Sequence, residues 1–286
     1  MTAEPGDRRL FVTLGPQRYR VERPFGDFDR GRALVSDVAC DSRGHVFVLL
    51  RLDPLVDAPA DPVVELDPQG AFVRSFGAAD ILDAHMLAVD ADDRVVVVDR
   101  DAHRLVFFGT DGRAMRTIGS PECPGEPFSH PSSVAFAADG SFYVADGYGT
   151  SRVQHFSAAG DLVGSFGRRG KAPGEFSTPH GVWVAADGRV LVTDRENDRL
   201  QVFSADGEPL DAWPDLPRAM DVWSAPDGSV FVTDQVPRLS RYDADGRLVG
   251  SCRPVLNGAH GIWGTADGTL FLAEVNPSRI TRLTPV

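Results

Sequence analysis

The chain of 286 residues has only three cysteines, and none lies close to another. Cys40, Cys123 and Cys252 form no CxxC pair, so the sequence has neither a disulfide framework nor a thiolate zinc site. Disulfide-stabilised proteins belong to oxidising compartments. We therefore expect this chain in the reducing cytoplasm.

Long apolar runs are also absent. No segment approaches the roughly 18 consecutive apolar residues that a membrane-spanning helix needs. The opening stretch MTAEPGDRRL has no apolar segment of the kind found in secretory signals. The sequence therefore predicts no membrane association.

Positive charge is in short supply, with 29 Lys and Arg against 41 Asp and Glu and a formal net charge of −12. Such a chain repels a phosphate backbone on average, so we expect no nucleic-acid partner. The GxSxG and P-loop signatures are missing as well. The hydrophobic content of 42% is nevertheless that of a globular protein with a sizeable core.

The sequence does contain an internal repeat that runs along its whole length. One unit, from His180 to Trp213, reads HGVWVAADGRVLVTDRENDRLQVFSADGEPLDAW. It contains four apolar segments, and Asp-Gly pairs of the kind found in hairpin turns separate the first from the second and the third from the fourth. Similar units begin at six places, namely Ser36, Ala84, Pro131, Pro179, Ala219 and Ala259.

Four strands per unit at intervals of about 40–50 residues are typical of propeller blades. The last unit has only three strands, but RYRVERPFG, which ends at Gly26, resembles the fourth strand of the other units. We therefore predict an all-β, six-bladed β-propeller in one domain over residues 1–286, closed by this N-terminal strand. We expect residues 1–9 to form a flexible tail and the protein to be a monomer.

Three of the seven histidines share one repeat position. His85, His180 and His260 each lie seven residues before a turn carboxylate, in alternate units. The same count in the other units gives Ser36, Ser132 and Met220. Because the first strand of a blade borders the axis of a propeller, the three imidazoles are expected to converge there.

Three neutral imidazoles with an open fourth position suit a catalytic Zn²⁺. Copper, iron, cobalt and nickel also bind imidazole. The alternative is that the histidines only cap their strands. The other histidines lack this register, and we interpret them as surface or structural residues: His45, His103, His130 and His155.

The second strand of each blade ends on the face where the first begins. That places Arg51, Arg100, Tyr148 and Arg195 at the mouth beside the histidines. Arginines there suit a substrate that carries a carboxylate. The alternative, which we favour for Arg100 and leave open for Arg51 and Arg195, is that each pairs with a nearby acid.

Two other recurring positions have structural interpretations. Trp183, Trp223 and Trp263 recur in the first strand and are expected in the core. Aspartates at the ends of second strands are expected to accept hydrogen bonds that stabilise each repeat: Asp99, Asp146, Asp194 and Asp234.

The units resemble NHL repeats, most clearly in VADGYGTSRVQHF and VTDRENDRLQVF. Among NHL-repeat proteins, ADGYGTSR and PGEFSTPHGV resemble segments of peptidyl-α-hydroxyglycine α-amidating lyase. The resemblance implies zinc ligands at His85, His180 and His260, with Tyr148 as general base. It also implies that Arg51 binds the substrate carboxylate and that Arg195 is a supporting cation. The implied reaction splits a peptidyl-α-hydroxyglycine into a peptide amide and glyoxylate.

Two departures from that family stand out. Gly261 replaces an aspartate that helps to hold a structural Ca²⁺, which makes calcium doubtful, and Gly149 replaces a disulfide cysteine. The monooxygenase that makes the carbinolamide is also absent from this chain. The leading hypothesis is a zinc-dependent lyase, or a hydrolase, acting on a small-molecule or peptide substrate with a carboxylate. The alternative is a non-catalytic NHL propeller that binds a protein or peptide.

Overall fold

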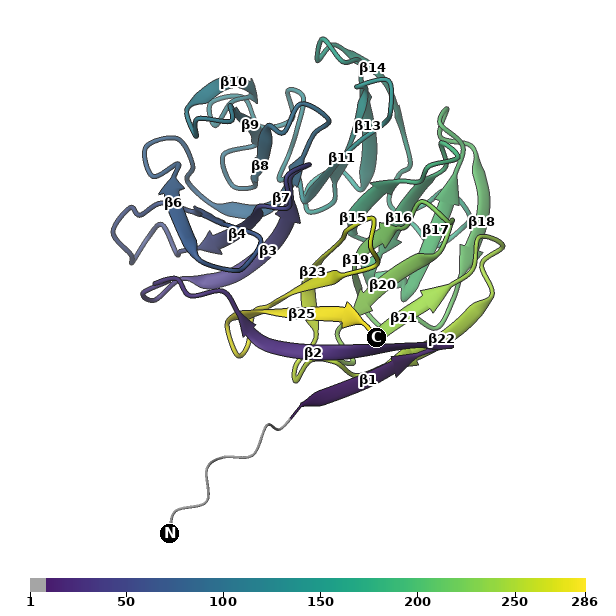
Figure 1. Ribbon diagram of the computed structural model, residues 1–286. Coiled ribbons are helices and arrows are strands. Elements are labelled where there is room, and N and C mark those ends of the chain that lie inside the picture. The colour runs from purple at the N-terminus through teal and green to yellow at the C-terminus, as the bar shows by residue number, and fades with distance from the viewer. Residues whose placement is uncertain (1–8) are drawn as a thin grey trace.

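The computed structural model describes residues 9–286 as a ring of six antiparallel sheets (Figure 1). Each blade forms because its apolar segments are joined by tight turns. Glycine supplies the left-handed backbone at such turns, as at Gly188 with φ +84°. The prediction of an all-β, six-bladed propeller is confirmed. Residues 9–286 contain no α-helix and no helix that is long and apolar enough to span a membrane.

The first three blades each have four strands in chain order. Blade I consists of β3 (Leu34–Cys40), β4 (Val46–Arg51), β5 (Val63–Leu66) and β6 (Phe72–Phe76). Blade II consists of β7 (Ala84–Val89), β8 (Val95–Asp99), β9 (Arg104–Phe108) and β10 (Ala114–Gly119). Blade III consists of β11 (Ser133–Phe136), β12 (Phe142–Asp146), β13 (Arg152–Phe156) and β14 (Leu162–Phe166).

The next two blades repeat the pattern and the last combines both ends of the described chain. Blade IV consists of β15 (Pro179–Val184), β16 (Val190–Asp194), β17 (Arg199–Phe203) and β18 (Pro209–Trp213), with a 3-10 turn η1 (Arg195–Asn197). Blade V consists of β19 (Ala219–Ser224), β20 (Val230–Asp234), β21 (Leu239–Tyr242) and β22 (Leu248–Cys252). Blade VI consists of β23 (Ala259–Gly264), β24 (Leu270–Glu274), β25 (Arg279–Pro285), β2 (Gln17–Phe25) and β1 (Leu10–Leu14).

The N-terminal strand closes the ring as predicted. Figure 1 shows β2 in purple beside β25 in yellow, and the register pairs Val21 with Leu283. The structure adds a feature that the sequence did not reveal, because β1 pairs with the far edge of β2 and makes blade VI five-stranded. The predicted tail, apart from Arg9, lies outside the described residues.

A β-bulge interrupts the first hairpin of five blades at the ring position defined by the repeat. The register shifts between Ala84 and Met86 and between Ala259 and Gly261, and it shifts between Pro179 and Val182 in blade IV. A bulge leaves one residue out of the pairing ladder and re-aims its side chain. The bulges in blades II and VI leave His85 and His260 unpaired, and the bulge in blade IV leaves His180 and Gly181 unpaired.

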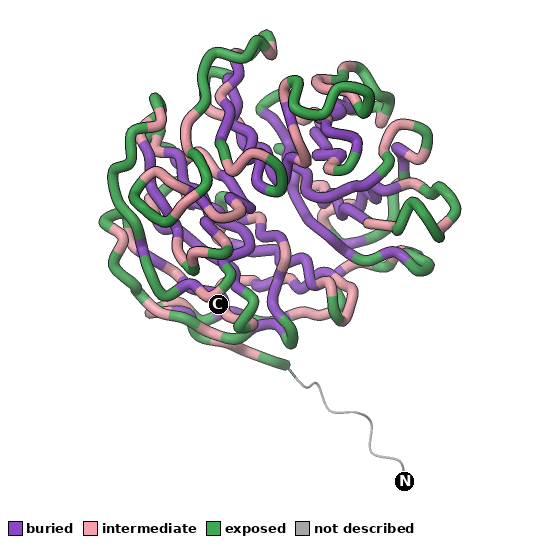
Figure 2. Tube along the Cα trace, turned by 180° about the vertical axis from the view of Figure 1, so that it is seen from behind, coloured by how far each residue is buried: buried purple, intermediate pink, exposed green. Residues whose placement is uncertain are grey.

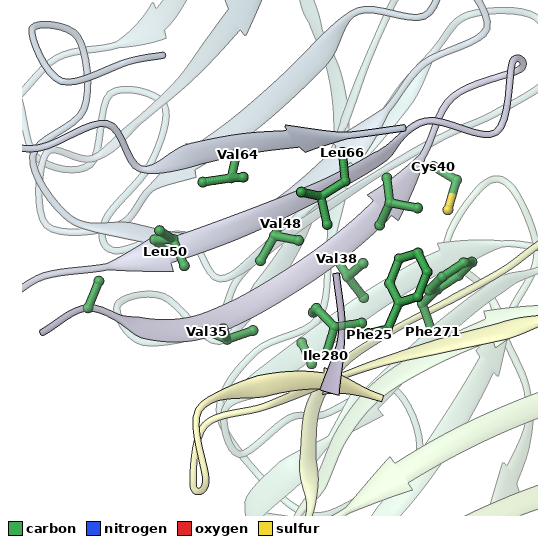
Figure 3. Close-up of a cluster of buried hydrophobic side chains, with 13 residues drawn as sticks. Phe25, Val35, Val38, Cys40, Val48, Leu50, Val64, Leu66, Phe271 and Ile280 are labelled. Atoms are coloured by element: carbon green, nitrogen blue, oxygen red, sulfur yellow. The ribbon is translucent and has the colours of Figure 1, made fainter. Parts of the chain in front are cut away.

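The core lies between neighbouring blades. Figure 3 shows one such cluster, in which Phe25 and Phe271 of blade VI pack with Val38 of blade I. The two phenyl rings meet edge to face, with centroids 5.3 Å apart. Figure 2 shows that burial follows the inner strands and that exposed residues lie mainly on the outer strands and turns. Neighbouring blades are therefore held together by apolar contacts around the propeller axis.

The other two recurring positions are also structural. Trp223 is buried, and Trp183 and Trp263 pack on several clusters while meeting each other at 5.1 Å. The strand-ending aspartates are fully buried. Asp99, Asp146 and Asp194 accept backbone N–H groups that precede a first strand, as Asp99 does from Asp83 at 2.7 Å, whereas Asp234 accepts those of Val236 and Arg238 in the loop that follows it. They stabilise each blade as predicted.

Candidate metal centre

The structure brings the three predicted histidines together on the propeller axis. They come from β7, β15 and β23, which belong to alternate blades, so they approximate three-fold symmetry. The ring centroids of His85, His180 and His260 lie 5.1, 5.1 and 4.9 Å from one another. Among residues 9–286, this is the one group of histidine, cysteine and acidic side chains close enough to hold a metal ion.

Each histidine is fixed by a hydrogen bond to the next blade around the ring. The Nδ1 atoms of His85, His180 and His260 lie 2.7, 2.7 and 2.9 Å from the carbonyl oxygens of Ser132, Met220 and Ser36. A carbonyl oxygen only accepts, so each Nδ1 carries the proton and donates it. The Nε2 lone pairs therefore remain available for the axis.

The surroundings keep these rings neutral. Burial lowers the pKa of His85 and of His180 well below the usual range, and neighbouring rings of the cluster lower both further. Burial likewise lowers the pKa of His260 to about 4. Metal ligation needs a neutral imidazole, so the cluster is already in the correct protonation state at neutral pH.

The donor set fits a metal ion. One ring nitrogen from each histidine lies within 4.8 Å of the others, and the buried Nε2 of His180 has no hydrogen-bond partner. A buried polar atom without a partner is costly, and coordination would remove that cost. Backbone carbonyl oxygens accept the Nδ1 hydrogen bonds of all three histidines, as is typical of metal-binding histidines.

Tyr148 lies directly beside this cluster. Its hydroxyl is 3.1 Å from Nε2 of His85, and it accepts a hydrogen bond from Nη1 of Arg195 at 3.1 Å. The guanidinium groups of Arg100 and Arg195 lie 5.3 and 5.4 Å from the centre of its ring. The structure therefore brings Tyr148, Arg195 and the histidines together, as the sequence predicted.

Two glycines allow the tyrosine to reach this position. A Cβ atom on Gly147 would lie 1.8 Å from the carbonyl oxygen of Pro179, and one on Gly149 would lie 1.7 Å from that of Ser129. Both contacts are with backbone, so neither neighbour can move aside easily. The segment GYG is thus pressed between the starts of blades III and IV, and Tyr148 is held over the axis.

The arginines at the mouth are paired with acids. Arg51 donates from Nε and Nη2 to Asp83 at 2.8 and 3.2 Å, which leaves its Nη1 without a partner among the described residues. Arg100 contacts Asp83 at 3.0 Å and Asp101 at 2.7 Å, as its sequence interpretation predicted. Arg195 contacts Glu196 at 2.9 Å.

Sequence reasoning missed Asp83. This buried carboxylate joins Arg51 to Arg100, and burial raises its pKa although both arginines act in the opposite direction. It lies two residues before the ring position, where the other units carry unrelated residues. No repeat signal was available to identify it.

Two further carboxylates lie one residue beyond the ring, on β3 and β19. Asp37 accepts backbone N–H groups from Val38 and Leu87, and Asp221 accepts one from Ile262 at 2.9 Å. A Cβ atom on Gly261 would lie 1.8 Å from Oδ1 of Asp37. Thus Asp37 fills the space beside Gly261. Each oxygen of Asp37 accepts one of these N–H groups.

The remaining histidines have partners elsewhere. His45 lies 2.6 Å from Glu65, and His155 stacks on Tyr143 with centroids 4.2 Å apart. His103 and His130 pack against each other, also at 4.2 Å. None belongs to the axial cluster.

Comparison with known proteins identifies the repeat. Residues 128–156 and 176–203, in blades III and IV, match the NHL repeat family. The chain carries NHL repeats. It is 33% identical over 140 residues to a probable peptidyl-alpha-hydroxyglycine alpha-amidating lyase of Caenorhabditis elegans, covering 46% of this chain and 40% of that protein.

A second relative is the peptidylglycine alpha-amidating monooxygenase of Rattus norvegicus. It is 27% identical over 246 residues, which cover 72% of this chain and 25% of that protein. The chain therefore spans a quarter to two fifths of the length of these curated relatives. One of these two relatives is named as an amidating lyase and the other as an amidating monooxygenase.

A solved structure supports the fold. The virginiamycin B lyase of Staphylococcus aureus superimposes with a TM-score of 0.68 at 12% identity, over 94% of this chain and all of that one. At this identity the similarity concerns the fold and carries no argument about the reaction.

Proposed function

We propose that this chain is a metal-dependent lyase that cleaves a carbinolamide bearing a carboxylate, R–CO–NH–CH(OH)–COO⁻. The observation that carries the proposal is the convergence of three neutral imidazoles beside the Tyr148–Arg195 pair. The names of its relatives supply the reaction type. A propeller that only binds a partner has no need of three convergent, buried imidazoles whose Nδ1 protons are all held by backbone carbonyls.

His85, His180 and His260 would hold the metal through Nε2. We propose zinc, because three imidazoles with an open fourth position are a catalytic zinc arrangement. The ion would act as a Lewis acid toward the substrate hydroxyl and make its proton easier to remove.

Tyr148 is the proposed base. Its hydroxyl lies within hydrogen-bond reach of His85, and the guanidinium groups of Arg100 and Arg195 lie over its ring. It takes the proton of the substrate hydroxyl. The carbon–oxygen double bond forms as the carbon–nitrogen bond breaks, and the electron pair stays on nitrogen. That nitrogen receives one proton, which yields a primary amide and glyoxylate.

Arg51 is the proposed anchor for the substrate carboxylate. Asp83 orients its guanidinium through Nε and Nη2, and Nη1 remains free to donate to an incoming carboxylate. Arg195 supports the charge on the Tyr148 oxygen through its hydrogen bond. The substrate would be a small molecule or peptide, with no role for nucleic acid or a membrane.

Metal content tests the first part of the proposal. Protein purified without chelators and loaded with Zn²⁺ is expected to retain about one equivalent per chain after desalting, measured by elemental analysis. His180→Ala should fall below half an equivalent. His45→Ala removes a histidine that pairs with Glu65 and should retain the metal. Equal occupancy in all three proteins would contradict the axial site.

Glyoxylate release tests the reaction. Zinc-loaded protein is incubated with N-benzoyl-α-hydroxyglycine, and glyoxylate is trapped and quantified against the spontaneous rate. We expect release that depends on both the metal and His180. Full metal occupancy without enhanced glyoxylate release would reject the reaction and leave the metal site standing.

A further inference from the structure

A cavity of about 390 Å³ opens beside His260, on the side of the axis away from Tyr148. Its walls come from three successive blades, V, VI and I, whereas Tyr148 and Arg195 come from blades III and IV. Arg51 is one of the residues that line it. The cavity is thus continuous with the proposed reaction site and extends it in one direction.

The mouth is asymmetric in charge. The residue at the end of the second strand is arginine in blades I, II and IV, as in Arg51 and Arg195, but Gln235 in blade V and Val275 in blade VI. The repeat therefore places arginines, each paired with an acid, in blades I, II and IV and neutral side chains in blades V and VI. Arg51, whose Nη1 has no partner among the described residues, can hold the anionic end of a substrate while the neutral end lies toward blades V and VI.

The cavity combines apolar and polar walls and has two unused amides. Its apolar walls come from Leu34, Val35, Met220 and Val275, and its polar side chains are Ser36, Arg51, Gln235, Asn257 and His260. Neither side-chain amide makes a hydrogen bond within the described residues. A primary amide both donates and accepts, so it matches the two polar atoms of a peptide group. An apolar pocket with a few orienting polar groups is typical of small-molecule sites.

We propose that this cavity binds the amide-nitrogen side of the substrate, namely a single apolar amino-acid residue or an acyl group of that size. Gln235 and Asn257 bind the peptide group of that residue, and Leu34 and Val275 contact its side chain. The volume lies near the low end of the range for small-molecule pockets, about 300–1,000 Å³. The substrate class is therefore an N-acyl aminoacyl-α-hydroxyglycine with an apolar side chain. This assignment rests on the proposed function.

Substrate discrimination tests the assignment. We compare N-acetylphenylalanyl-α-hydroxyglycine with N-acetylaspartyl-α-hydroxyglycine and N-formyl-α-hydroxyglycine. The wild-type kcat/KM for the phenylalanyl compound should exceed that for the aspartyl compound at least tenfold. In the double variant Gln235→Met with Asn257→Leu, KM for the phenylalanyl compound should rise about tenfold, because two hydrogen bonds are lost. Its preference over the formyl compound should fall by a similar factor.

The matched control is Gln17→Met, which changes a glutamine on β2, and it should keep the wild-type preference. Val275→Arg gives blade VI the arginine that blades I, II and IV have at this position. It should lower kcat/KM for the phenylalanyl compound at least tenfold. Equal kcat/KM for all three compounds, or a preference unaltered in the double variant, would overturn the pocket assignment while the lyase reaction stands.

A binding measurement separates the two proposals. N-acetylphenylalaninamide is the expected product, and its affinity for zinc-loaded protein is measured by calorimetry. The double variant should bind it about tenfold more weakly than the wild type and the Gln17→Met control. Weaker binding without glyoxylate release from any substrate would support the pocket and reject the reaction. Equal binding by all three proteins would reject the pocket.

Discussion

At the scale of the residue, each axial histidine depends on two local features. A β-bulge releases it from the strand ladder, and a carbonyl of the next blade holds its Nδ1 proton, as Ser132 does for His85. Together they aim Nε2 at the axis. A histidine at the same repeat position without the bulge would point into a face of the sheet.

Asp83 is expected to act as a positioning residue for Arg51. Asp83→Asn removes the negative charge that both arginines share, so the positive charges of Arg51 and Arg100 lie close together without it. KM for a carboxylate-bearing substrate should rise about tenfold while kcat changes less, because charge-assisted hydrogen bonds are the stronger ones. Steady-state kinetics measure this split.

The control is Asp101→Asn, since Asp101 is more exposed and contacts Arg100 but makes no ion pair with Arg51. It should keep a KM close to the wild-type value. If both variants behave alike, Asp83 has no specific role in placing Arg51.

Tyr148→Phe should lower kcat by about 10²–10⁴-fold, the usual contribution of a positioned general base. Metal occupancy should not change, because the histidines keep their carbonyl partners. Glyoxylate assays and elemental analysis measure the two effects. Tyr143→Phe is a suitable control, since its hydroxyl donates to Ala205 away from the axis. Wild-type turnover by Tyr148→Phe would remove this residue from the mechanism.

The sequence predicted the ring residues because they share a register with the turns, and it placed Tyr148 because strands one and two are antiparallel. It did not predict Asp83, Asp37 or Asp221. These carboxylates act through contacts with other blades, as Asp37 does with Leu87. Such contacts depend on how blades pack and not on the pattern within a repeat.

At the scale of the element, β2 carries the closure of the ring. Phe25 is fully buried at its end and packs against Phe271 in the cluster between blades VI and I. The resemblance of RYRVERPFG to the fourth strands of the other units was enough to predict this strand. The preceding β1 has no repeat counterpart, and for that reason the sequence did not reveal the fifth strand.

Phe25→Ala should lower the free energy of unfolding by about 3–5 kcal/mol, because it leaves a cavity in a packed cluster. Denaturant titration followed by tryptophan fluorescence measures the change. Leu10→Ala on β1 is the matched control. Leu10 is 41% exposed, so the expected change is within about 0.5 kcal/mol. Similar effects for both would mean that β2 does not hold the ring.

At the scale of the whole molecule, Asp37 and Asp221 link stability to pH. Burial raises the pKa of Asp221 to about 7, and burial together with the Asp221 carboxylate raises that of Asp37 well above its usual range. The folded state therefore holds protons that the unfolded state has released above about pH 4. Their contribution to stability is complete below that pH and is lost as pH rises toward about 7.

Asp221→Asn should remove part of the loss of folding stability that accompanies rising pH. Relative to the wild type, the variant should gain stability as pH rises from about 4 to about 7, with a slope of at most about 1.4 kcal/mol per pH unit for one proton. Urea titrations across this range measure it. Asp245→Asn, which removes an exposed carboxylate, is the control variant. A stability difference between Asp221→Asn and the wild type that does not change with pH would contradict the raised pKa of Asp221.

Ring closure also sets the order in which the strands pair and the axial site is assembled during folding. During synthesis β2 is made early, but Val21 cannot pair with Leu283 until nearly all of the described chain exists. Pairing so distant in sequence slows folding. His260 belongs to the blade that is completed last, so the proposed three-ligand metal site would be fully assembled only at closure. An ion bound there would then stabilise the closed ring by mass action. In a nascent chain, metal uptake would thus report that the propeller is finished.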